Sequence, residues 1–352
     1  MSTTNNSPLV SSPFIESNDS VAKVMRLVIY AMLPGILVYT MLFGWGVIIN
    51  ITITILSALF FELVMLLIRR RPVKLFLFDG SAIITAILLS LSMPPLVPWW
   101  LLVIGGFFAI VVAKHLYGGL GYNTFNPAMA AYAILLVSFP RELSMWSAPS
   151  ESINYTLSFV ETLKYSFFQV LPSPIEFDAL TSATILDHIR TETGLGKSIA
   201  EIKQSPIFGY AAATGYEWVN LAFLFGGLWL IYKKIITWHI PVAVLAALAL
   251  ISSISYFINP IFFSSPLLHV LGGASILGAF FIATDPITAS TTPLGRIIYG
   301  AGIGILIFAI RIWGSYPDGV AFAVLLMGLT VPLLDYYTTP KVYGERARND
   351  KI

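Results

Sequence analysis

Long apolar runs dominate this chain of 352 residues and limit what it can fold into. There are ten of them, each roughly 20 residues long, which is the length of helix that crosses the core of a bilayer. Charged residues make up only 11% of the chain, about half the fraction usual in soluble domains. We therefore expect an all-α polytopic membrane protein. The predicted helices cover residues 26–43, 46–68, 80–96, 97–114, 126–140, 217–233, 239–257, 267–284, 295–313 and 317–335.

Three prolines interrupt the apolar run between the third and fourth predicted helices. Pro94, Pro95 and Pro98 each remove a backbone donor and clash with a continuing helix. The run therefore forms either a tight hairpin of two helices or one kinked segment, so that nine helices are an alternative to ten.

The positions of lysine and arginine predict the orientation, because short loops rich in these residues stay on the cytoplasmic side. With ten helices and a cytoplasmic N-terminus, 14 of the 20 basic residues lie inside. The opposite side then carries one long segment, residues 142–216, in which acidic residues outnumber basic ones. We expect both termini to be cytoplasmic and this segment to face outward.

The outer segment separates the helices into two sets of five. An odd number of helices in each set gives the sets opposite orientations, which is the arrangement of an inverted repeat. A short sequence similarity supports the repeat, since His115-Leu-Tyr-Gly118 in the first set resembles Arg311-Ile-Trp-Gly314 in the second. The predicted parts are a cytoplasmic segment 1–25, a first repeat 26–141, the outer segment 142–216, a second repeat 217–337 and a cytoplasmic tail 338–352.

Composition excludes several kinds of chemistry. The chain has no cysteine, which rules out disulfides, thiolate catalysis and cysteine-ligated iron–sulfur clusters, and its four scattered histidines predict no metal site. A net charge of +2 predicts no nucleic-acid surface. The polar N-terminal stretch predicts no removable signal peptide. If the protein handles electrons, an organic cofactor must carry them.

Breaks in the predicted helices and the few charges within them mark candidates for a second site. Non-helical backbone at membrane depth occurs only where it meets protein, a cofactor or water, and intramembrane charges are costly. Asn126 could equally cap a helix that begins at Pro127, Asp79 and Asp285 could cap helices, and Glu62 could pair or snorkel near Arg69. Asp285 could also pair with Arg296, Arg311 could bind a phosphate or carbonyl group of a ligand or anchor at the interface, and His269 is expected to be a packing residue. The candidates are Gly118, Gly119, Gly121, Asn123, Asp79, Asp285 and Glu62.

The most informative motif lies in the outer segment. Residues 178–184 read D-x-x-T-S-A-T, with Asp178, Thr181, Ser182, Ala183 and Thr184 as the defined positions. In a soluble protein such a stretch would most simply be a helix start, capped by Thr181 or Asp178.

In this setting the motif resembles the flavinylation sequence of a family of membrane proteins. The family includes the D subunit of Rnf ion-translocating complexes and the B subunit of sodium-pumping quinone reductases. The resemblance implies that a periplasmic flavin transferase joins FMN through its phosphate to the last threonine, here Thr184. Ser182 stands where related sequences often have glycine, which leaves the acceptor threonine unchanged.

The resemblance covers essentially the whole chain and favours the Rnf protein. It implies a bacterial inner-membrane electron relay with Thr184 in the periplasm, a second, non-covalent flavin such as riboflavin among the helices, and partner subunits A, B, C, E and G that hold the iron–sulfur centres. The complex would couple ferredoxin and nicotinamide redox chemistry to Na⁺ or H⁺ movement. The segments that carry the resemblance are Ser12–Phe14, Pro34-Gly35, Phe43–Gly46, Phe78–Ser81, Gly118–Pro127, Thr284–Pro286, Gly295-Arg296 and Tyr316–Phe322.

An inverted-repeat transporter or channel for a small solute, without a redox group, is the alternative. Helix number, charge placement and broken helices suit both hypotheses equally. Only the outer motif and the family resemblance separate them, because a solute carrier has no evident use for a flavin-accepting threonine.

Overall fold

The computed structural model describes residues 20–150, 155–173, 177–205, 207–209, 212–314 and 316–340. These residues are almost entirely helical. Six helices are long and apolar enough to cross a membrane, and shorter apolar helices cover Trp99–His115 and Pro127–Ser138. The expectation of a polytopic helical membrane protein is confirmed, whereas the count of ten, the inverted repeat and the orientation remain predictions.

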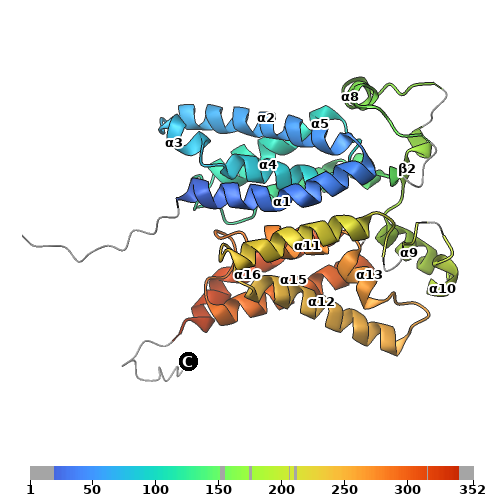
Figure 1. The fold of residues 1–352 in the computed structure, drawn as a ribbon. Coiled ribbons are helices and arrows are strands. Elements are labelled where there is room, and N and C mark those ends of the chain that lie inside the picture. Colours follow the sequence, from blue (N-terminus) through green and yellow to red (C-terminus); the bar gives the residue numbers. More distant parts are fainter. Residues whose placement is uncertain are drawn as a thin grey trace, which may run out of the picture.

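The helices before the outer segment form one group (Figure 1). The prolines lie between α4 and α5, so the hairpin is correct and the kinked segment is wrong. The first helix begins earlier than predicted, because Ser20 caps it by accepting the N–H of Lys23. The elements of this group are α1 (Val21–Phe43), α2 (Gly46–Ile68), α3 (Val73–Leu77), α4 (Ser81–Leu91), α5 (Trp99–Phe107), the π-helix η1 (Phe108–His115) and α6 (Pro127–Ser138).

The helices after the outer segment form the second group, drawn in yellow to red in Figure 1. The predicted helix over residues 267–284 is wrong as a continuous element, because it breaks at Gly272 and Gly273. Gly273 has a φ of 67°, which a residue with a side chain rarely adopts. The elements are α11 (Tyr216–Tyr232), α12 (His239–Ile258), α13 (Pro266–Leu271), α14 (Ser275–Leu277), the π-helix η4 (Gly278–Ile282), α15 (Pro293–Trp313) and α16 (Val320–Thr338).

The outer segment caps one end of both groups, and the start of α1 and the end of α16 lie at the other end (Figure 1). It adds short helices and a two-stranded antiparallel sheet, which the all-α expectation did not include. Ile185, Leu186 and Ile189 pack with Leu268 of α13 in a small apolar core. This core joins the outer segment to the second group. Its elements are α7 (Pro140–Ser144), β1 (Trp146–Ser147), α8 (Phe159–Phe168), the 3-10 turn η3 (Phe177–Ala179), β2 (Thr181–Ser182), α9 (Ile185–Gly194) and α10 (Ile199–Ile202).

The two groups meet along α1 and α11, which pack side by side. Glycines make this close approach feasible. A Cβ atom on Gly226 would lie 1.9 Å from the carbonyl oxygen of Ala31, and one on Gly35 would lie 2.3 Å from the ring of Phe223. The contact between the groups therefore depends on the absence of side chains at these two positions.

Gly226→Ala should destabilise the protein by about 1–3 kcal/mol, because the new methyl group meets backbone that cannot move without separating α1 from α11. The matched control is Gly328→Ala in α16, where nothing lies within 4 Å of the added atom. Thermal unfolding of the two variants in the same detergent checks the prediction. Equal melting temperatures would contradict it.

Candidate functional site

The motif of residues 178–184 crosses three short elements of the outer segment. Ala179 ends η3, and the side chain of Asp178 lies outside what the structure describes. Thr181 and Ser182 form β2, which pairs with β1 so that Ser182 lies opposite Trp146. The exposed Ala183 leads directly to Thr184. The sheet thus fixes the chain just before the threonine.

Thr184 is the N-cap of α9. Its hydroxyl oxygen accepts the backbone N–H of Asp187 at 3.2 Å. The motif is therefore a helix start as well, with the cap at Thr184; Thr181 as the cap is wrong, because its hydroxyl donates to the carbonyl of Phe177 instead. A helix N-terminus presents unpaired N–H groups and a partial positive charge, so the position of Thr184 favours a bound anion.

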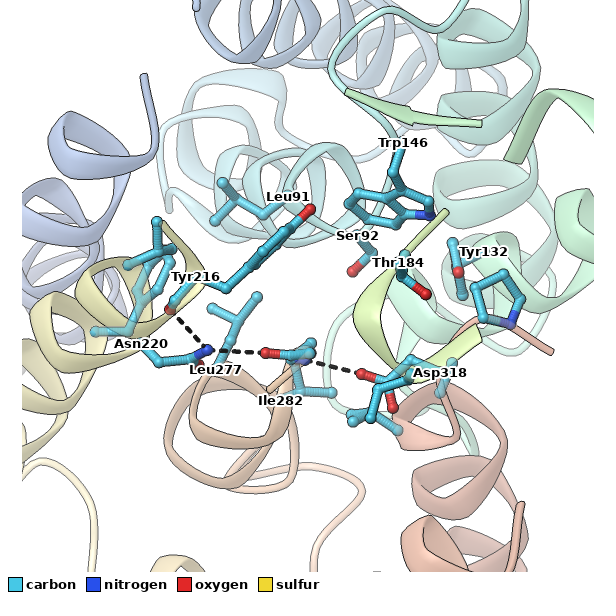
Figure 2. Close-up of a pocket in the computed structure, with 18 of the residues that line it drawn as sticks. Leu91, Ser92, Tyr132, Trp146, Thr184, Tyr216, Asn220, Leu277, Ile282 and Asp318 are labelled. Carbon is cyan, nitrogen blue, oxygen red and sulfur yellow. Dashed lines mark hydrogen bonds between the residues drawn. The ribbon is translucent and has the colours of Figure 1, made fainter. Parts of the chain in front are cut away.

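Thr184 also lines a deep pocket at the outer end of the helices (Figure 2). The pocket encloses about 900 Å³ of unfilled space, part of which is open solvent. Both helix groups and the outer segment contribute to its mostly apolar wall. The lining residues are Tyr39, Leu91, Ser92, Met129, Tyr132, Trp146, Thr184, Ile185, Leu186, Tyr216, Val219, Asn220, Phe223, Gly273, Ala274, Leu277, Ile282, Pro317, Asp318, Val320 and Ala321.

The break between α13 and α14 forms part of this wall, and buried side chains satisfy its backbone groups. Asn220 donates through Nδ2 to the carbonyls of Leu271 and Gly273, at 2.8 and 2.9 Å. Asp318 accepts the N–H of Ala274 at 2.8 Å. These partners stabilise the backbone at the break in the wall of the pocket.

Arg311 also stabilises the break between α13 and α14. Its guanidinium pairs with Asp318, at 2.9 Å from Nε to Oδ1, and donates to the carbonyl of His269 and the hydroxyl of Ser275. The side chain is 1% exposed. The expectation of an interface anchor is therefore wrong, and the guanidinium, engaged by protein groups, holds the walls of the pocket together.

Arg190 ties the threonine-bearing helix to the second helix group. Its guanidinium donates to the carbonyls of Gly314 and Tyr316, at 2.9 and 3.1 Å, and pairs with Asp187. The arginine therefore offsets the negative charge of Asp187 in the first turn of α9, where it would otherwise oppose a bound anion.

The residues around Thr184 fit a flavin mononucleotide joined to the hydroxyl. The phosphate would lie at the start of α9, where its charge is favoured, and the ring would enter a mostly apolar pocket. A group attached at Thr184 would have access to the pocket, because Thr184 itself lines it.

A second pocket, with about 920 Å³ of unfilled space, lies between the helix groups near the start of α1. Two residues predicted for a second site, Asn123 and Asp285, line it together with Lys114 and Asn126. Asn126 caps α6 by accepting the N–H groups of Ala128 and Met129, as predicted. The remaining lining residues are Val24, Met25, Val28, Ser81, Ile84, Thr85, Leu88, Leu120, Pro127, Leu230, Ile235, Ile236, Phe280, Phe281, Thr284, Pro286 and Ile287.

The glycine stretch shapes the turn beside this second pocket. Gly118, Gly119 and Gly121 have φ values of 131°, 97° and 92°, which favour glycine over any other residue. The turn carries Leu120 and Asn123 to the pocket wall, while the three glycines themselves are outside the lining.

Glu62 belongs to a buried ionic network next to the second pocket. Its side chain is 2% exposed, with Oε2 2.8 Å from Nζ of Lys114 and Oε1 3.2 Å from Nε2 of His115. Lys114 also donates to the hydroxyl of Ser81, which donates to Asp79 at 2.6 Å. The structure thus brings together Glu62 and Asp79 through Lys114, the last residue of the helix predicted over residues 97–114.

Asp79 also accepts the N–H of Ser81, the first residue of α4, at 2.7 Å, but the N-cap of this helix is Gly80. Asp285 accepts the hydroxyl of Thr288 at 2.9 Å, within a turn. Arg296 makes its bonds elsewhere, to the carbonyl of Ser290 and the hydroxyl of Thr237.

His269 is 2% exposed and lies 3.0 Å from the hydroxyl of Ser264. The ring also packs against Phe308, with 5.2 Å between the centroids. Its predicted packing role is therefore confirmed.

Fold and site together define a polytopic helical membrane protein with a pocket that contains Thr184 at one end and a second pocket, which contains Asn123 and Asp285, at the other. The sequence profile of the NQR2, RnfD, RnfE family matches residues 9–344, so the chain belongs to this family.

Curated relatives agree over nearly the whole length. The D subunit of the ion-translocating oxidoreductase complex of Aliivibrio salmonicida (strain LFI1238) is 47% identical over 345 residues, covering 96% of this chain and 98% of the relative. The protein of the same name from Yersinia pseudotuberculosis serotype O:1b is 48% identical over 347 residues, covering 96% and 99%. That from Vibrio atlanticus is 48% identical over 343 residues, also covering 96% and 99%.

Proposed function

We propose that this chain is the D subunit of an ion-translocating oxidoreductase complex and carries FMN on Thr184 as a membrane electron relay. The observation that carries the proposal is the position of Thr184, which is both the N-cap of α9 and part of the wall of an apolar pocket. The names and identities of the relatives support the membership in the complex.

Attachment requires a transferase and FAD. The Thr184 oxygen attacks the FMN phosphorus of FAD, the pyrophosphate bond breaks, AMP leaves, and the hydroxyl proton passes to a base of the transferase. The resulting phosphodiester keeps one negative charge, and the start of α9 stabilises it. The bound flavin supplies one- and two-electron redox chemistry.

The protein around Thr184 controls where a flavin attached there can lie. The sheet formed by Trp146 and Ser182 fixes the preceding residues, and Arg190 holds α9 on the carbonyls of Gly314 and Tyr316. The apolar lining excludes water from part of the pocket and leaves the phosphate end at its rim. The chain's own contribution is therefore to fix the cofactor in position next to the helices.

The second pocket is our candidate for the non-covalent flavin or for part of the ion path. Asn123 and Asp285 offer polar groups in its wall, and the ionic network of Glu62 and Lys114 adjoins it. The two pockets come close at one aromatic contact, because Phe223 of the first and Phe281 of the second have centroids 6.0 Å apart. Electrons that enter at one pocket would thus have a short path to the other.

In this proposal the complex lies in the bacterial inner membrane and the Thr184 end faces the periplasm. It couples ferredoxin and nicotinamide redox chemistry to the movement of Na⁺ or H⁺. Since the chain has no cysteine, iron–sulfur clusters must belong to partner subunits, which we expect to be A, B, C, E and G. Maturation needs the periplasmic flavin transferase.

Peptide mass spectrometry of the chain purified from its own host tests the attachment site. We expect the peptide that contains Thr184 to be heavier by one FMN less water, with fragment ions that assign the addition to Thr184 and not to Thr181 or Ser182. An unmodified peptide, from a host shown to flavinylate other proteins, would contradict the proposal and favour the small-solute transporter.

A further inference from the structure

Three hydrogen-bond donors in the wall of the Thr184 pocket have no partner among the described residues beyond the contact of the two tyrosine hydroxyls with each other. They are the hydroxyl of Tyr39, the hydroxyl of Tyr216 and the indole N–H of Trp146, and all three polar atoms are buried. Buried polar atoms of proteins nearly always have a partner, so three such donors around one pocket point to a ligand with several acceptors.

The donors come from three parts of the chain. Tyr39 lies in α1, Tyr216 begins α11, and Trp146 lies in β1 of the outer segment. The rings of Tyr39 and Tyr216 are neighbours, with 6.4 Å between their centroids, and a bond between their hydroxyls would still leave one phenol free to donate. Figure 2 shows Trp146 next to Thr184 and Tyr216 on the other side of the pocket. Donors therefore surround the space that a group on Thr184 would enter.

Two other polar side chains of the pocket are already engaged by protein groups. Both oxygens of Asp318 accept bonds from Arg311, and further bonds from Ala274 and Gly319. The amide nitrogen of Asn220 donates to backbone carbonyls. These two side chains hold the wall, so the donors that remain for a ligand are those of the aromatic residues.

We propose that Tyr39, Tyr216 and Trp146 bind the isoalloxazine ring of the flavin on Thr184 and hold it inside the helix bundle. A flavin ring is flat and largely apolar, with carbonyl oxygens and ring nitrogens as acceptors on one edge, and these features match apolar walls with a few convergent donors. This inference rests on the proposed function and adds the residues that position the ring.

Hydrogen bonds to the ring edge have a consequence for its redox behaviour. The neutral phenols and the indole donate to atoms that gain negative charge when the ring accepts electrons, and such bonds are stronger to a charged acceptor. The three residues therefore raise the midpoint potential of the ring above the value that it would have in the same pocket without these donors.

The test uses Tyr39→Phe, Tyr216→Phe and Trp146→Phe in the whole complex, with Tyr299→Phe as the matched control. Tyr299 also has a buried hydroxyl without a partner among the described residues, but it lines neither pocket described above. We measure covalent flavin fluorescence on a denaturing gel, fluorescence anisotropy of that flavin in the folded complex, and its midpoint potential.

We expect all variants to keep the covalent flavin, and the three pocket variants to show a lower midpoint potential and a lower anisotropy than the parent. A Tyr39→Phe/Tyr216→Phe double variant should show a larger fall, and Tyr299→Phe none. A fluorescent band combined with unchanged potentials, or with the anisotropy of unfolded chain in the parent, would overturn the inference. Absence of a fluorescent band in the parent would instead overturn the proposed function.

Discussion

Thr184→Val should abolish covalent flavin fluorescence in the denatured chain and stop electron transfer through the complex. Valine has nearly the shape of threonine but lacks the oxygen that would form the phosphodiester. The loss of the N-cap bond to Asp187 adds a cost of about 1 kcal/mol to the helix, too little to unfold the protein. The measurements are gel fluorescence and the rate of electron transfer by the purified complex.

Thr181→Val is the matched control for that substitution. Thr181 belongs to the same motif, and its hydroxyl bonds only to the carbonyl of Phe177 at 3.3 Å. We expect the control to retain the fluorescent band if the transferase requires only the last hydroxyl. Thr184→Ser should also keep flavin. A Thr184→Val chain that still fluoresces after denaturation would show that the flavin is attached elsewhere.

Glu62→Gln should cost about 3–5 kcal/mol in stability, because it leaves the ammonium of Lys114 buried without a compensating carboxylate. Both side chains are about 2–3% exposed, so water cannot take over the role of the lost partner. We expect a large fall in melting temperature and in the amount of complex that can be extracted from the membrane.

Two further variants isolate the effect of burial. Glu62→Gln combined with Lys114→Met removes both charges and should recover most of the lost stability. Glu192→Gln breaks an ion pair in which Lys197 is 54% exposed, and it should cost no more than about 1 kcal/mol. Equal melting temperatures for Glu62→Gln and Glu192→Gln would contradict the network as a structural element.

The sequence predicts the helical membrane fold because burial of apolar runs in a bilayer depends on local composition. It also predicts the helix start at Pro127 and its cap Asn126, since both depend on neighbouring residues. The N-cap of α9 is Thr184, three residues after Thr181, which the sequence predicts as the cap. Both residues belong to the same motif. Glycine pairs such as Gly272-Gly273 are a local signal that could have located the break in the eighth helix.

The partner of Glu62 could not be predicted in the same way. The sequence places Lys114 at the cytoplasmic end of the predicted helix 97–114, where lysines usually reach water. The π-helix of Phe108–His115 changes the helical period there, and Lys114 is buried against α2 and α4. The same limit applies to the pocket, because Tyr39, Trp146 and Tyr216 come together only through tertiary packing.

The central claim is that the flavin on Thr184 carries electrons through this protein. Rapid-mixing spectroscopy of the anaerobic complex tests it directly, with the covalent flavin followed during reduction by ferredoxin or nicotinamide. The account predicts that this flavin is reduced and reoxidised at least as fast as the complex turns over, and that Thr184→Val removes the signal and the turnover together. A covalent flavin that stays oxidised during full turnover would contradict the claim.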